Sequence, residues 1–133
     1  MNKKSILSVF FYIAAAYDGL LGAIFLLSPN YLFTVFEVTP PNHPGYVQFS
    51  AALLVVFALM FTAIAIDPLR NRNLIPYGIL LKVSYAGIVF YYWATTGVPA
   101  MWKPFAIIDL AFMLGFVWSF MLIPSLREAE ATG

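Results

Sequence analysis

Three ionisable residues, Asp18, Lys82 and Asp109, lie inside stretches of the chain that are otherwise apolar. A charged side chain at the depth of a bilayer is costly, so it normally faces the interior of a helix bundle. There it marks an ion or ligand pathway, or it forms an ion pair. If two carboxylates and one ammonium meet in a dry site, the ammonium compensates only one of the acids. The other must be protonated or wait for a cation. The pattern therefore predicts a proton-linked or cation-linked site.

The composition of the 133-residue chain places these charges at membrane depth. Apolar residues make up 62% of the chain and charged residues only 10%, whereas a soluble domain carries about 25% charged residues. A net charge of +1 provides no basic surface for nucleic acid. The absence of cysteine excludes disulfides, thiolate metal sites and cysteine nucleophiles. We expect one integral membrane domain with no nucleic-acid partner.

Four apolar runs are each near the roughly 20 residues that a helix needs to cross about 30 Å of hydrocarbon. They lie near residues 5–27, 45–66, 75–97 and 104–125, and Pro-containing polar segments separate them. Backbone groups in lipid must pair within their own segment, so the runs predict helices. We expect an all-α fold, with a single domain over residues 1–133 that forms an antiparallel four-helix bundle. The segment 31–38 is compatible with a short helix in the membrane interface.

Basic residues outside the spans predict the orientation in the membrane. A four-span layout puts only Lys103 on one side and five basic residues on the other: Lys3, Lys4, Arg70, Arg72 and Arg127. Basic residues are enriched on the cytoplasmic side of membrane proteins, so both termini should be cytoplasmic. We expect a multi-pass protein of the cell inner (cytoplasmic) membrane, surrounded by membrane lipid.

Depth decides whether the three charges can meet. At 1.5 Å per residue, Asp18 lies about 20 Å and Asp109 about 22 Å above the inner boundary. The Cα of Lys82 lies about 12 Å above it, and the flexible stem extends toward the acids. Gln48 and Tyr85 are expected in the same layer. The predicted ligand-binding or ion-binding residues are therefore Asp18, Lys82, Asp109, Gln48 and Tyr85.

The charged residues and other features also have interpretations that involve structure alone and no ligand. Buried ion pairs often only fix the register of helices, and Lys82 could extend to the inner interface without a partner. The small-residue stripe of Ala15, Gly19 and Ala23 fits packing within one chain better than a dimer seam. His43, the only histidine, lies in a Pro-rich loop without other ligands at a metal-binding spacing. No metal site and no cofactor is expected.

Four short segments are distributed over most of the chain. They are Tyr17-Asp18-Gly19-Leu20-Leu21-Gly22, Asp67-Pro68-Leu69-Arg70, Leu81-Lys82 and Ile108-Asp109-Leu110. Together with the basic start and the Pro-rich loop after the first span, this layout resembles small bacterial membrane proteins of the DoxX-like group. The resemblance implies a four-helix membrane fold. Some members of that group are associated with quinone-linked sulfur oxidation, and many are uncharacterised.

Three functions stay open. The first is binding or transport of a small molecule, a proton or a cation, including a lipophilic or cationic ligand, with both aspartates as exchangeable acids. The second is an accessory role in a homo-oligomer or a larger membrane complex, respiratory and quinone-linked complexes included, where the charges only hold helices together. The third is a membrane enzyme acting on a lipid or quinone. Phosphate-binding loops, Ser-His-Asp sets and dinucleotide fingerprints are absent, so a non-enzymatic function is favoured and no catalytic residue is assigned.

Overall fold

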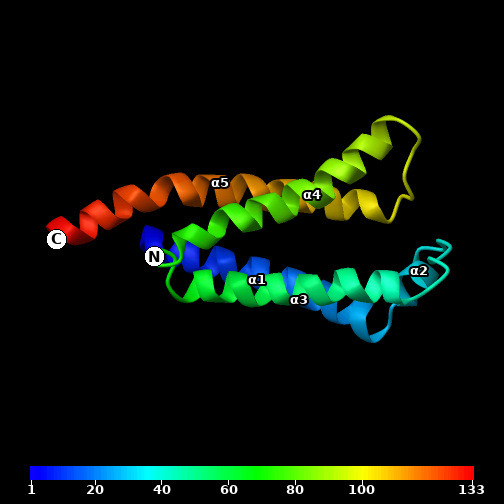
Figure 1. Ribbon diagram of the computed structural model, residues 1–133. Helices are drawn as coiled ribbons and strands as arrows, with labels where there is room; N and C mark the ends of the chain where they lie inside the picture. The colour runs from blue at the N-terminus through cyan, green and yellow to red at the C-terminus, as the bar shows by residue number, and fades with distance from the viewer.

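Helices connected by short loops make up the chain, and no strand is present (Figure 1). The structure is a computed structural model that describes all residues from 1 to 133. Four helices are long and apolar enough to cross a membrane: α1 (Lys3–Leu27), α3 (Gly45–Ile66), α4 (Ile75–Ala94) and α5 (Trp102–Thr132). Two short elements are α2 (Tyr31–Val35) and the 3₁₀ helix η1 (Arg72–Leu74). The predicted all-α fold with four long apolar helices is confirmed, and it indicates a multi-pass membrane protein.

Successive long helices run in opposite directions and form two hairpins (Figure 1). α1 packs along α3, and α4 packs along α5, while close backbone contacts between the two pairs are few. Both chain termini and the α3–α4 connection lie at one end of the molecule, which we call the terminal end. α2 and the α4–α5 loop lie at the opposite end, which we call the distal end. The seam between the hairpins therefore runs the length of the molecule.

Each long helix buries one stripe of residues against the others. The stripe in α1 has a spacing of three or four, as neighbours on one helical face require, and consists of Leu7, Phe11, Ala14, Ala15, Asp18, Gly22 and Phe25. Large apolar side chains such as Ile13 and Leu20 are exposed on the other faces. A surface of this kind suits lipid contact. Asp18 lies within the buried stripe and away from that surface.

Gly22 allows a close approach of α1 and α3. A Cβ atom at Gly22 would lie 2.8 Å from the carbonyl oxygen of Ala51, so a side chain there would push the helices apart. A Cβ atom at Gly19 would lie 3.4 Å from the Cβ of Ala58 in the same helix pair. The small-residue stripe of α1 thus packs within the chain, in agreement with the intramolecular interpretation.

Two helix ends differ from the apolar runs in the sequence. α4 ends at Ala94 because Gly97 has a φ of 89° and its N–H donates to the carbonyl of Tyr92, a common way to end a helix. α5 continues to Thr132 although its apolar run ends near residue 125. The polar segment that follows contains Leu, Arg, Glu and Ala, which are good helix formers. Hydropathy indicates the part of a helix that suits lipid. The helix propensity of the residues that follow explains why α5 extends beyond that part.

Pro124 lies inside α5 and has no N–H, so the carbonyl of Phe120 loses its helical partner. Arg72 replaces that donor. Its Nε donates to the Phe120 carbonyl oxygen at 2.9 Å, and its guanidinium lies 3.6 Å from the centroid of the Phe120 ring. Arg127 donates to the carbonyl of Leu69 in the α3–α4 connection. These two arginines fasten α5 to that connection at the terminal end.

The replacement of a backbone donor by Arg72 is testable. We expect Arg72→Met to lower the free energy of unfolding by about 1–3 kcal/mol, because the Phe120 carbonyl is left without a donor. In the Pro124→Ala background the helix supplies its own N–H, so the loss should be smaller by roughly 1 kcal/mol. Thermal unfolding in detergent micelles measures this double-mutant cycle. Arg70→Met is the control, since that exposed side chain makes no hydrogen bond or ion pair. Equal losses in both backgrounds would contradict the interpretation.

Candidate functional site

Asp18, Lys82 and Asp109 meet at the seam between the two hairpins. The Nζ atom of Lys82 lies 2.8 and 3.0 Å from the two carboxylate oxygens of Asp18, and 2.9 Å from Oδ1 of Asp109. The three residues belong to the buried stripes of α1, α4 and α5. The lysine therefore contacts both aspartates and does not extend alone to a membrane interface. We call these residues the charged trio.

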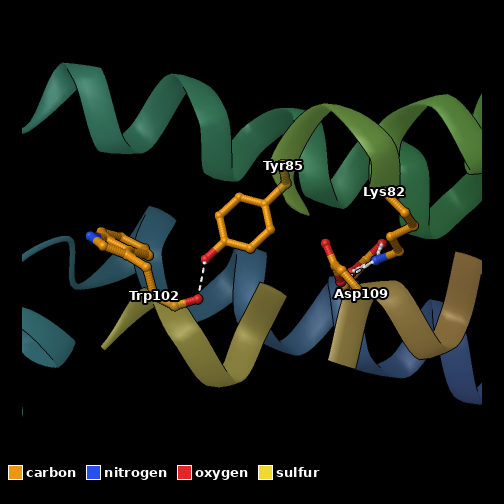
Figure 2. Close-up of polar contacts among 5 residues, drawn as sticks. Lys82, Tyr85, Trp102 and Asp109 are labelled. Carbon is orange, nitrogen blue, oxygen red and sulfur yellow. Dashed lines mark hydrogen bonds and ion pairs between the residues drawn. The ribbon is translucent and has the colours of Figure 1, made fainter. Parts of the chain in front are cut away.

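The two carboxylates of the charged trio are not equivalent. Asp18 accepts two hydrogen bonds from Lys82, and both side chains are 1% exposed. Asp109 accepts one hydrogen bond at Oδ1, and its side chain is 10% exposed. No hydrogen bond within the chain reaches the Oδ2 atom of Asp109. One Asp109 oxygen is turned away from the ammonium, on the side where Tyr85 lies (Figure 2). Asp18 and Lys82 thus form a compensated pair, and Asp109 adds a carboxylate with one free oxygen.

The charged trio carries a formal imbalance. With all three groups ionised, two negative charges and one positive charge leave one negative charge in the seam. An uncompensated charge in a low-dielectric interior is strongly unfavourable, because it loses its hydration without gaining a partner. A proton or a cation at Asp109 would remove the imbalance.

Aromatic rings close the seam on the terminal side of the charged trio. The lysine ammonium lies 5.9 and 5.4 Å from the ring centroids of Phe61 and Phe112, within the range of cation–π attraction. Phe116 stacks on Phe11 at 5.1 Å between ring centroids and lies 5.0 Å from Phe61. Phe11, Phe61 and Phe116 are completely buried. This aromatic cluster fills the seam between the charged trio and the terminal end.

On the distal side, the seam opens into a cavity of about 790 Å³. Its walls come from all four long helices and from the loops at the distal end. Asp18 and Asp109 line the cavity, whereas Lys82 does not, and no other basic residue lines it. The remaining wall is mainly apolar and aromatic, and it includes Phe25, Phe33, Tyr46, Tyr92, Trp102 and Phe105. The cavity therefore presents acidic groups within an apolar wall.

Gln48 and Tyr85 do not join the charged trio. The hydroxyl of Tyr85 donates to the carbonyl of Trp102 at 3.0 Å, although the ring lines the cavity (Figure 2). The side-chain amide of Gln48 donates to the carbonyl of Leu26 at 3.3 Å and lies outside the cavity wall. The last carbonyls of a helix lack helical donors, so Gln48 serves the end of α1. The sequence predicts a layer with polar groups from all four helices. In the structure this layer contains polar groups from three helices, α1, α4 and α5.

Tyr17 is a candidate site residue that the sequence did not indicate. Its hydroxyl is buried and has no hydrogen-bond partner, and its side chain lines the cavity together with Asp18 and Asp109. A buried hydroxyl without a partner costs about 1–3 kcal/mol, so this group is a local loss of stability close to the charged trio. Adjacent residues on a helix project about 100° apart. The position of Tyr17 next to Asp18 in the sequence therefore does not predict that both side chains line the same cavity.

The hydrogen bonds of the charged trio predict a large contribution of Lys82 to the free energy of unfolding. Lys82→Met leaves two buried carboxylates without a counter-charge, and we expect it to lower the free energy of unfolding by about 3–5 kcal/mol. Lys82→Met/Asp18→Asn should lose less, because one of the unpaired charges is removed. Lys4→Met is the control: it breaks an exposed ion pair with Glu130 and should cost less than about 1 kcal/mol. Thermal unfolding in detergent micelles gives all three values. Similar losses for Lys82→Met and Lys4→Met would show that the buried pairs contribute little.

Comparison with known proteins adds no further assignment for this site. The chain matches no protein-family model, no curated protein and no solved structure. The resemblance to the DoxX-like group therefore stays a prediction. The site consists of a compensated Asp18–Lys82 pair beside a partly free Asp109 carboxylate at a cavity.

Proposed function

We propose that this chain is a multi-pass protein of the bacterial inner membrane that binds a small molecule, a proton or a cation at the charged trio. In this proposal both termini are cytoplasmic and the cavity lies toward the opposite side. The distribution of basic residues supports the orientation. Lys3, Lys4 and the α3–α4 connection lie at the terminal end, and basic residues favour the cytoplasmic side. Lys103, near the start of α5, is the one basic residue at the distal end.

The observation that carries the proposal is a cavity that reaches a carboxylate with a free oxygen. Ligand sites are usually concave and mostly apolar, with a few polar groups that orient the ligand. The cavity above the charged trio has this character, and its volume of about 790 Å³ is sufficient for a small organic molecule. Asp109 is the residue that we propose to contact the ligand. Asp18 and Lys82 would position it.

A purely structural role accounts less well for Asp109. The Asp18–Lys82 pair by itself joins α1 to α4 with two hydrogen bonds and full compensation of charge. Adding Asp109 joins α5 to this pair but introduces a further negative charge. A buried charge in excess lowers stability unless a partner arrives. An accessory subunit held together by its charges has no need of that excess, whereas a binding site does.

Access of water to the cavity is the test of this function. The chain has no cysteine, so single cysteines can be introduced cleanly. Ser84 and the neighbouring Val83 are both exposed, but only Ser84 lines the cavity, so Val83 should face lipid. A thiol reacts with N-ethylmaleimide as the thiolate, which forms where water reaches it. In membranes we expect Ser84→Cys to react on the order of tenfold faster than Val83→Cys.

Ser119→Cys serves as a second control, because Ser119 is completely buried beside the aromatic cluster. It should stay unreactive in the folded protein. Slow and equal labelling at positions 83 and 84 would contradict a water-filled cavity and with it the proposed function. Fast and equal labelling would contradict the placement of Val83 against lipid.

A further inference from the structure

We propose that the cavity selects an organic monocation, a molecule with a single positive charge on an apolar body. This inference rests on the proposed function and names the ligand class of the same site. The charges that face the cavity are acidic. The wall contains Asp18 and Asp109 and no basic side chain, because Lys82 lies behind the two carboxylates. One net negative charge is compensated by one positive charge. An anion would add to the excess, and a neutral molecule would leave it in place.

The free carboxylate oxygen suits a positively charged group. The Oδ2 atom of Asp109 has no hydrogen-bond partner, and the side chain that carries it is only 10% exposed. A positive charge beside this oxygen would compensate the carboxylate by ion pairing, which needs no N–H donor. Tyr17, whose ring centroid lies 5.5 Å from the Lys82 ammonium, also belongs to the cavity wall and adds an aromatic face to the site.

The rest of the wall suits an apolar body. Aromatic rings of Phe25, Phe33 and Trp102 pack together on one side of the cavity, with ring centroids 5.7–6.1 Å apart. Tyr92 and Phe105 also line the wall. Aromatic faces attract cations, and the attraction grows when water is excluded. The same rings provide apolar surface for the substituents of an organic cation.

A lateral opening gives such a molecule a way in from lipid. The cavity wall includes Leu53 of α3 and Ile88 of α4, whose side chains are also exposed at the molecular surface. α3 and α4 make few close backbone contacts. The gap between these two helices is therefore the entry that we propose. An amphiphilic cation that has partitioned into the membrane can approach the carboxylates by this route.

An inorganic cation fits the site less well. Metal ions such as Ca²⁺ take six to eight oxygen ligands, and the chain has no cluster of three or more acidic or histidine side chains that could hold a metal. Both Asp18 oxygens already accept hydrogen bonds from Lys82. A single free carboxylate oxygen with an aromatic wall favours a cation that needs few ligands.

Tetraphenylphosphonium and tetraphenylborate test this class, because they share size and shape and differ in the sign of charge. Binding to the purified full-length protein in detergent micelles is measured by equilibrium dialysis, with partition into empty micelles subtracted. We expect tetraphenylphosphonium to bind on the order of tenfold or more tightly than tetraphenylborate.

Asp109→Asn should weaken binding of the cation by about tenfold or more. This variant keeps the Asp18–Lys82 pair and should fold. Glu37→Gln removes an equal charge from an exposed residue at the distal end that does not line the cavity, and should change binding by less than about twofold.

Protection of Ser84→Cys from N-ethylmaleimide provides a second measurement in a protein with an intact charged trio. Tetraphenylphosphonium should slow the labelling, and tetraphenylborate should not. Equal effects of the two ions, or unchanged binding of the cation by Asp109→Asn, would overturn the monocation class. If Ser84→Cys reacts readily but neither ion protects it, the ligand class is wrong and the proposed function stands. If Ser84→Cys does not react at all, the proposed function fails as well.

Discussion

A single ammonium placed between two carboxylates in the seam organises this molecule. The three groups come from α1, α4 and α5, so they join the α1–α3 hairpin to the α4–α5 hairpin. Ion pairs at membrane depth tolerate little displacement, because a separated charge has neither water nor a partner. The two hairpins are therefore held together at the depth of the charged trio. Packed phenylalanine rings fill the seam on one side of that depth, and the helices diverge around a cavity on the other side.

The asymmetry between the carboxylates shows how stability and binding are divided in the seam. Asp18 is saturated by Lys82 and contributes to holding the helices. Asp109 shares the same ammonium but keeps a free oxygen at the edge of the cavity. Proteins commonly accept a local loss of stability where a group must stay available for a ligand.

The four long helices are predictable from the sequence because long apolar runs have few stable structures other than a helix in lipid. The meeting of the three charges also follows from helical rise, since Asp18 and Asp109 lie at nearly the same depth and a lysine stem is long. The hydrogen bonds are harder to predict. Whether Gln48 reaches the charged trio or the end of α1 depends on how each helix is rotated about its axis. The free oxygen of Asp109 depends on the distance between the hairpins. Hydropathy encodes neither rotation nor distance.

The arginine that replaces a missing backbone donor has a consequence for how the chain is made. Translation proceeds from the N-terminus, so Arg72 leaves the ribosome before Phe120 and Pro124 do. Pro124 interrupts the backbone hydrogen bonds of α5, and Arg72, which replaces the missing donor, is synthesised first. The last helix can therefore close against a prepared surface, and its unpaired carbonyl need not persist during assembly in the membrane.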